Sequence, residues 1–72
     1  MFQREIFAKR LRDLRKKTKE SREDLAKSIG VTVSQISEME NGRKGTTMDR
    51  LVLLCEHFQV SADYLLGLKD EE

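Results

Sequence analysis

The 72-residue sequence contains no proline, no tryptophan, four glycines, one cysteine and one histidine. Proline and glycine are the residues that most often end regular elements and form turns, so their scarcity favours helices joined by short connections. A chain of this length has material for only one small hydrophobic core. We therefore expect a single all-α domain over residues 1–72, with an ordered core from about residue 3 to residue 67.

The lack of cysteine and histidine excludes several kinds of site. Cys55 has no second cysteine to pair with, and together with His57 it is too small a set for a zinc site. His57 has no nucleophile or acid at a spacing typical of catalysis, and the segment NGRKG lacks the spacing of a phosphate-binding P-loop. We expect a protein that is not an enzyme and that needs no metal, cofactor or small-molecule ligand.

Long apolar runs are also missing. No run is long enough to cross a bilayer, and the segment MFQREIF lacks the basic and then apolar pattern of a signal peptide. An unpaired cysteine is typical of a reducing compartment. We therefore expect a cytoplasmic protein that does not contact a membrane.

Charge is abundant and unevenly distributed. The net charge is only +1, yet residues 1–27 hold ten Lys or Arg against five Asp or Glu, and residues 28–72 hold four against eight. Such an uneven field can steer an anionic partner to one side of a protein. The run LRKKTKE by itself is equally well explained as the basic last turn of a helix, which the helix dipole favours.

Three helices are predicted in the first part of the chain. Apolar residues at positions 7, 11 and 14 follow helical spacing and predict a helix over about residues 3–17. Ser21-x-x-Asp24 resembles a capping box and predicts that a second helix begins there and ends at Gly30. Thr32-x-x-Gln35 predicts a third helix almost at once, ended by Asn41-Gly42. Two helices of about eight residues joined by so short a turn must cross at a steep angle.

Two further helices complete the prediction. Thr46 or Thr47 caps a fourth helix, in which Cys55 lies among apolar neighbours and is expected to be a small core residue. Ser61 caps a short fifth helix that Gly67 ends. The acidic tail over residues 68–72 is expected to be frayed.

The stretch SREDLAKSIGVTVSQISEMENG resembles the helix-turn-helix of the Cro/repressor family, also called the XRE family. The resemblance extends from about residue 7 to residue 67, and it rests on the joint occurrence of Leu25-Ala26, Gly30-Val31, Ile36, Glu40-x-Gly42, Val60-Ser61 and Leu65-Leu66. It implies a compact five-helix bundle of the lambda repressor-like type. It also implies a transcriptional regulator, expected to be a repressor, whose third helix enters the major groove of a palindromic operator in double-stranded DNA.

The resemblance also implies roles for individual residues. Those expected at base edges are Thr32, Val33, Ser34, Ser37 and Glu38, with Gln35 as the next candidate. Those expected at phosphates are Arg22, Asn41, Arg43 and Lys44. Arg15 and Glu40 are expected to form a structural ion pair that fixes the third helix against the first. A homodimer is expected, with an interface formed by Phe58, Val60, Tyr64, Leu65 and Leu68, although these residues could instead close the core of a monomer.

The sequence departs from the family pattern at two places. Arg22 stands where these repressors usually have glutamine, which replaces a neutral hydrogen-bonding group by a longer charged one. Thr46 stands where the loop after Gly42 usually has proline, so we expect this loop to be less rigid.

An alternative function comes from a different class of protein. The same bundle could serve as a protein-interaction module, such as an antitoxin or the partner of an antirepressor, because a fold does not by itself determine a function. The low positive charge of the third helix favours this alternative mildly, and the basic residues expected around that helix favour DNA.

Overall fold

The structure, a computed structural model, describes all residues from 1 to 72. It is all-helical, with a radius of gyration of 10.8 Å and extents of 28 × 23 × 20 Å. The five helices are α1 (Arg4–Lys17), α2 (Arg22–Ile29), α3 (Val33–Glu40), α4 (Met48–Phe58) and α5 (Ala62–Leu66). The all-α prediction and the five-helix architecture are confirmed.

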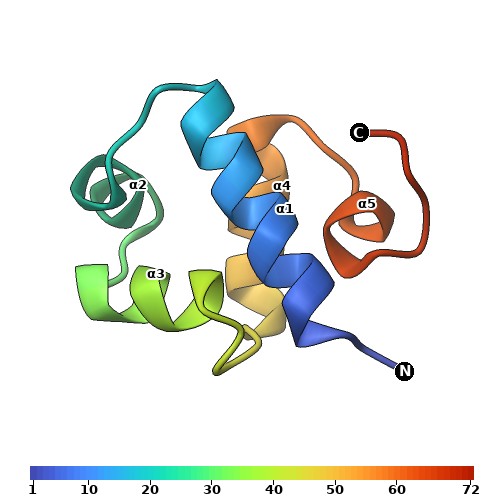
Figure 1. Ribbon diagram of the computed structural model, residues 1–72. Coiled ribbons are helices and arrows are strands. Elements are labelled where there is room, and N and C mark those ends of the chain that lie inside the picture. The colour runs from blue at the N-terminus through green and yellow to red at the C-terminus, as the bar shows by residue number, and fades with distance from the viewer.

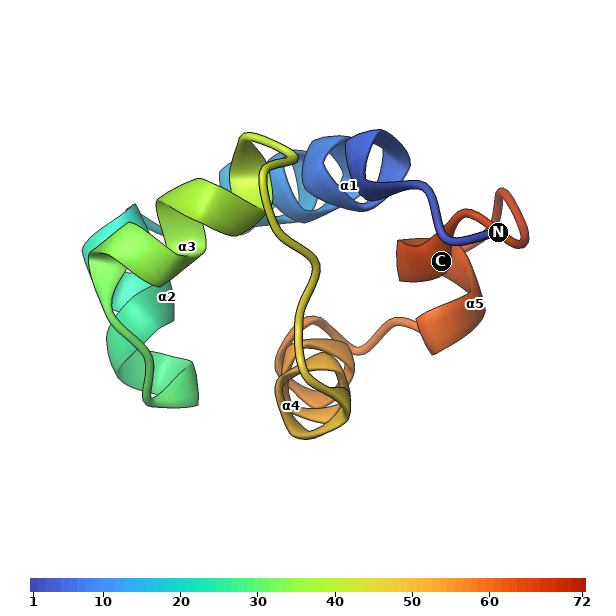
Figure 2. The same cartoon turned by 90° about the horizontal axis from the view of Figure 1, so that it is seen from below.

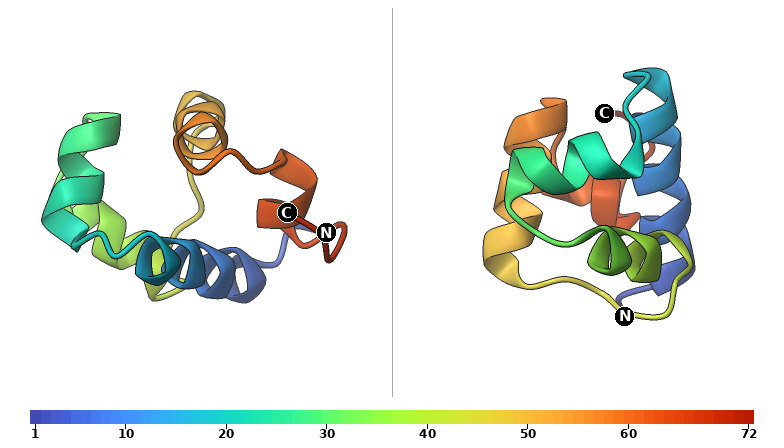
Figure 3. Two further views of the ribbon diagram at one scale, coloured as in Figure 1. Left: turned by 90° about the horizontal axis from the view of Figure 1, so that it is seen from above. Right: turned by 90° about the vertical axis from the view of Figure 1, so that its left-hand side faces the viewer.

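Helix α1 lies at the centre of the arrangement. In Figure 1, α2 and α3 lie to one side of it and α5 to the other, while α4 lies behind. Helix α1 packs against α3 and α5, α2 packs against α3 and α4, and α4 packs against α5. In the right panel of Figure 3, which views the molecule from the side of α2 and α3, α2 lies above α3, and the two short helices stand between α4 on the left and α1 on the right.

Side-chain caps begin four of the five helices. Ser21 and Thr32 accept hydrogen bonds from the backbone N–H groups of Asp24 and Gln35, and both capping boxes are complete. Thr47, rather than Thr46, caps α4 by accepting from the N–H of Arg50 at 3.2 Å. Each cap satisfies an N–H group that has no partner within its helix, which matters most for helices too short to be stable alone.

The turn between α2 and α3 depends on Gly30. Its backbone is left-handed, with φ of 72°, and its N–H group bonds to the carbonyl oxygen of Ala26. A side chain would strain this conformation, whereas glycine adopts it freely. The chain can therefore reverse direction and begin α3 within three residues.

One hydrophobic core joins the helices. Its centre consists of side chains from all five helices and Val60, namely Phe7, Leu11, Leu14, Leu25, Ala26, Ile29, Ile36, Met39, Leu51, Leu54, Val60 and Leu65. Cys55 packs against this cluster, half-buried, as expected for a small core residue. The one buried charged residue is Glu40, at the end of α3.

The C-terminal tail, which the sequence suggested would be frayed, makes specific contacts. The backbone N–H of Ser61 donates to the carbonyl oxygen of Glu72 at 3.1 Å, and the ammonium of Lys17 contacts both carboxylate oxygens of Glu72 at 3.0 and 3.1 Å. Arg10 donates to the carbonyl oxygen of Lys69 and to the carboxylate of Asp70. The basic residues of α1 therefore hold the acidic tail beside the helix.

Candidate nucleic-acid interface

The outward side of α3 carries short polar and β-branched side chains. Thr32, Val33 and Ser34 are exposed, while Ser37 and Glu38 are half-buried. The opposite side of the helix is held in the core by Ile36 and Met39. The five residues expected at base edges therefore lie at the surface together, along one short and rigidly anchored helix.

Gln35 is less free than its neighbours. Its side-chain oxygen accepts a hydrogen bond from the N–H of Thr32 at 2.9 Å and so completes the capping box. Only the amide NH2 group of Gln35 remains available to a partner. This geometry explains why Gln35 is a weaker candidate for base contact than the residues beside it.

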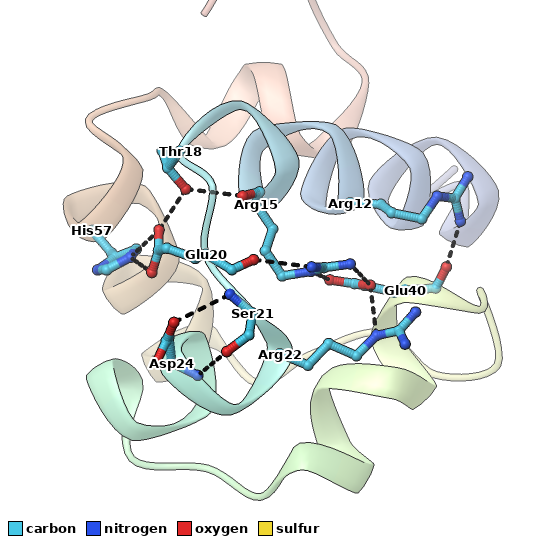
Figure 4. Close-up of polar contacts among 9 residues, drawn as sticks. All are labelled: Arg12, Arg15, Thr18, Glu20, Ser21, Arg22, Asp24, Glu40 and His57. Carbon is cyan, nitrogen blue, oxygen red and sulfur yellow. Dashed lines mark hydrogen bonds and ion pairs between the residues drawn. The ribbon is translucent and has the colours of Figure 1, made fainter.

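A buried carboxylate fixes α3 to the rest of the molecule. Glu40 is completely buried, and Arg15 donates to both of its oxygens, from Nε to Oε2 at 2.6 Å and from Nη2 to Oε1 at 3.1 Å. Arg12 donates to the backbone carbonyl oxygen of Glu40 at 2.8 Å. Figure 4 shows these arginines reaching the end of α3 from α1. The ion pair that the resemblance implied is present in the structure.

The electrostatics of Arg15 follow from this contact. The hydrogen bond to Glu40 raises the pKa of Arg15 above its ordinary value. Desolvation by burial lowers this pKa, but by less than the hydrogen bond raises it. Arg15 also donates to the carbonyl oxygen of Glu20 at 3.0 Å, in the turn that leads to α2. One guanidinium thus joins α1, the following turn and α3.

Arg22, expected to contact phosphate, has an additional partner. Its Nε lies 3.1 Å from Oε1 of Glu40, and its side chain is 42% exposed. Because only Nε is engaged, the two terminal nitrogens of the guanidinium remain available at the surface. Glu40 therefore orients Arg22 at the start of α2 (Figure 4).

The loop after α3 brings the other expected phosphate-contacting residues to the same side. Asn41, Arg43 and Lys44 are all exposed. Lys44 lies 3.5 Å from the carboxylate of Glu38, so a residue expected at phosphate and one expected at a base edge form an ion pair. Seen from below in Figure 2, this loop runs from α3 to the start of α4, past the first turns of α1.

The residues expected at a dimer interface do not form one surface. Leu65 is completely buried in the core, and Val60 is 8% exposed. A side chain with little or no exposed area has little to bury against a partner, so these two residues fit the alternative in which they close the core of the monomer. Leu68 is 72% exposed, and Phe58 and Tyr64 are half-buried. The guanidinium of Arg10 covers the ring of Tyr64, 4.4 Å from its centroid.

His57 and Glu20 form a polar pair that the sequence did not predict. Nε2 of His57 lies 2.9 and 2.8 Å from the two carboxylate oxygens of Glu20, which also accepts a hydrogen bond from Thr18 at 2.6 Å. His57 belongs to the last turn of α4 and Glu20 to the turn after α1, at a separation in sequence that no local motif spans (Figure 4). The contact joins α4 to the entry of the helix-turn-helix.

Two further kinds of feature are absent from the structure. No group of three or more His, Cys, Asp or Glu side chains is arranged to hold a metal ion. No helix has both the length and the apolar character that a membrane span requires.

The chain is similar to known proteins in both sequence and structure. YobD of Bacillus subtilis strain 168, an uncharacterised HTH-type transcriptional regulator, is 41% identical over 66 residues, which cover 92% of this chain and 59% of YobD. The chain therefore spans about three-fifths of the length of this relative.

Two solved structures of regulatory proteins have a similar arrangement of helices. The P22 c2 repressor in complex with synthetic operator 9T has a TM-score of 0.83 and 33% identity, over 88% of this chain and 96% of the repressor chain. The restriction-modification controller protein C.AhdI from Aeromonas hydrophila has a TM-score of 0.78 and 26% identity, over 86% and 94%. The helix-turn-helix family model matches residues 9–65. This range includes the capping boxes and the glycine turn of α2 and α3, and the chain belongs to the helix-turn-helix family of Cro/repressor type.

Proposed function

We propose that this chain is a sequence-specific DNA-binding transcriptional regulator that inserts α3 into the major groove. The observation that carries the proposal is the exposure of Thr32, Val33 and Ser34 on a helix whose other side is fixed by the core and by Glu40. A recognition helix needs this combination, because base edges are read by side chains whose position is set before contact. The likeness to a repressor bound to an operator supports the same function.

The side chains of α3 suit close contact with base edges. The methyl groups of Thr32 and Val33 can pack on the methyl group of thymine, and the hydroxyl groups of Ser34 and Ser37 can hydrogen-bond to several bases. Glu38 can accept a hydrogen bond from the amino group of cytosine. Of these contacts, that of Glu38 selects most strongly for one base.

Affinity would come from the residues around α3. Arg43 and Asn41 are exposed on the loop, and the free terminal nitrogens of Arg22 lie at the start of α2. Phosphate contacts of this kind position a protein on DNA without reading its sequence. This division explains how a helix with no basic residue of its own can lie against a polyanion.

We also propose that the protein represses from a palindromic site as a homodimer. A body with a longest extent of 28 Å fits one half-site, and two half-sites of a dimer are spaced by about one turn of DNA, roughly 34 Å. Of the residues expected at the interface, Leu68, Tyr64 and Phe58 keep accessible area. Likeness to the P22 c2 repressor favours repression over activation.

The dimer is tested by sedimentation with and without operator DNA. Leu68→Glu should weaken the dimer and the binding of a full palindrome, while binding of a single half-site should persist. Lys69→Glu introduces a carboxylate at the next exposed position and serves as the control. Equal effects of the two variants would remove Leu68 from the interface.

The function itself is tested by selection from random duplex DNA, followed by a salt titration of the selected site. A regulator enriches a defined sequence, and its affinity falls steeply with salt because phosphate contacts release counterions. Ser34→Ala with Ser37→Ala should change the enriched sequence without changing the melting temperature. Failure to enrich any sequence at low salt would defeat the proposal and favour a protein-interaction module.

A further inference from the structure

Two cations that the family resemblance does not assign to DNA, Arg4 and Arg50, lie beside Lys44, which it does assign to a phosphate. Arg4, Lys44 and Arg50 come from α1, the loop after α3 and the first turn of α4. Together with Phe2, Gly45, Thr46 and Thr47 they line a surface depression of about 690 Å³. No acidic residue lines it, although Glu5 and Asp49 are exposed neighbours in sequence.

Direct contacts set the shape of the loop that forms this depression. A Cβ atom added to Gly45 would stand 2.9 Å from Cε2 of Phe2, so the ring lies directly on the loop backbone. Phe2 in turn packs edge-on against the buried Phe7, with ring centroids 5.9 Å apart. Arg4 donates from Nη1 to the carbonyl oxygen of Arg43 at 3.3 Å. The N-terminal segment thus supports a loop that lacks the usual proline.

The charges in the depression are not neutralised within the protein. Neither Arg4 nor Arg50 forms an ion pair, and Lys44 has only the 3.5 Å contact with Glu38, with its own side chain 70% exposed. Three cations with so little compensation from carboxylates fit an oxyanion.

The position of the depression indicates which oxyanion it suits. Figure 2 shows the start of α4, the loop and the first turns of α1 on the same side of the molecule as α3. A DNA duplex held by α3 on this side would continue past the loop toward the start of α4. A free anion, by contrast, would be weakly held in so open a depression.

We propose that Arg4 and Arg50, with Lys44, bind a phosphodiester of the DNA backbone outside the bases read by α3. The proposal rests on the proposed DNA-binding function. Contacts of this kind hold the duplex to the protein at a second point along its length and fix the angle at which α3 enters the groove. Arg4 and Arg50 are therefore positioning residues for sequence recognition.

The salt dependence of binding gives the first test. The logarithm of the binding constant falls against the logarithm of salt concentration with a slope of about 0.9 per phosphate contact. Arg4→Gln/Arg50→Gln should reduce the slope by about 0.9, and should weaken operator and random DNA by the same factor. Lys9→Gln removes one exposed charge from α1, outside the depression, and should leave the slope unchanged. Arg50→Lys keeps the charge and should therefore keep the wild-type slope.

A phosphate map gives the second test. Ethylation of individual operator phosphates should reveal one or two positions, outside the selected bases, that impair the binding of the wild type but not of Arg4→Gln/Arg50→Gln. Circular dichroism would establish that the double variant is folded. Identical maps and slopes for wild type and double variant, with sequence selection intact, would overturn this inference alone. Wild-type protein that selects no DNA sequence would instead defeat the proposed function.

Inorganic phosphate distinguishes a backbone site from a site for a small anion. Titration of the free protein with sodium phosphate, against sodium chloride of equal ionic strength, would be followed by NMR at the amides of residues 44–47. We expect the chemical shifts of these amides not to saturate at phosphate concentrations below the millimolar range. Saturation at lower concentration, abolished by Arg50→Gln while operator binding is unaffected, would assign the depression to a small ligand and overturn the proposal.

Discussion

Arg15 and Glu40 form a two-point hydrogen bond across the core, with Nε 2.6 Å from Oε2 and Nη2 3.1 Å from Oε1. Glu40 is completely inaccessible to solvent, and Arg22 binds the same carboxylate from α2 at 3.1 Å. Removing a carboxylate from water is costly, and these hydrogen bonds offset the cost. The ion pair therefore holds the end of α3 in place against α1 and α2.

Arg15→Ala should destabilise the fold before it alters sequence preference. Loss of one partner leaves a buried charge insufficiently compensated, which typically costs about 3–5 kcal/mol. That is a large part of the roughly 5–15 kcal/mol by which small domains are stable. Urea denaturation would measure the loss. At low temperature, the folded fraction should keep the wild-type ratio of operator to random-DNA affinity.

Lys16→Ala is the matched control, because it removes an exposed cation from the same turn of α1. It should change the free energy of unfolding by no more than about 0.5 kcal/mol. If Arg15→Ala unfolded at the same urea concentration as Lys16→Ala, the ion pair would have no structural role.

Glu38→Ala and Arg43→Ala should separate specificity from affinity. Glu38→Ala removes the group expected to select cytosine, and it also frees Lys44, which lies 3.5 Å from that carboxylate. Its sequence preference should relax while its affinity for random DNA rises. Arg43→Ala should weaken all sequences alike, because a phosphate contact carries no base information.

Competition binding with operators altered at single positions would measure both effects. Glu38→Gln is a useful companion, because it keeps the length and removes the charge; it should raise nonspecific affinity and change the preferred base. An unchanged preference in both Glu38 variants would show that Glu38 does not read DNA.

Local chemistry was sufficient to predict the helices. The two capping boxes and the left-handed Gly30 depend on residues within four positions of one another, so spacing in the sequence reveals them. The core side of each helix follows from periodicity for the same reason. Thr46 and Thr47 could not be told apart as caps, because the choice depends on where the loop approaches α4.

Contacts between distant segments were harder to predict. Glu38 with Lys44, Glu20 with His57, and the tail beside α1 are set by how the helices pack. The same packing places Leu65 in the core rather than at an interface, since an apolar residue on a short helix can face either way. Arg15 with Glu40 was anticipated only through family resemblance.

Cys55 should react slowly with alkylating agents. Burial raises the pKa of its thiol, with a smaller contribution from the charge of Glu56, so fewer thiolates are present at a given pH. Iodoacetamide should modify the native protein more slowly than the urea-unfolded protein, and the pH midpoint of the rate should be higher in the native state. Equal rates and midpoints would place the thiol in open solvent.

The same shift implies a change of stability with pH. A thiol whose pKa is higher in the folded state retains its proton there while the unfolded chain loses it. Stability attributable to Cys55 is thus present below the unfolded pKa of about 8.5 and decreases as pH rises above it. Cys55→Ala should show a smaller decrease than wild type in urea melts between neutral and alkaline pH.

Gly67→Ala should destabilise the protein more than Gly30→Ala. Both glycines are left-handed, with φ of 82° and 72°, so alanine at either position incurs about 1–2 kcal/mol of backbone strain. A Cβ at Gly30 meets nothing within 4 Å, whereas one at Gly67 would stand 2.8 Å from Cγ2 of Ile6. Crowding of this kind typically adds about 1–3 kcal/mol.

A double-mutant cycle isolates the crowding from the strain. In an Ile6→Ala background Cγ2 and Cδ1 are absent and only Cβ remains, at 3.4 Å, so Gly67→Ala should cost about as much as Gly30→Ala does in the wild type. Urea denaturation of the variants supplies all the required free energies. If the cost of Gly67→Ala were the same with and without the Ile6 side chain, the end of α5 would not rest on α1 as the structure has it.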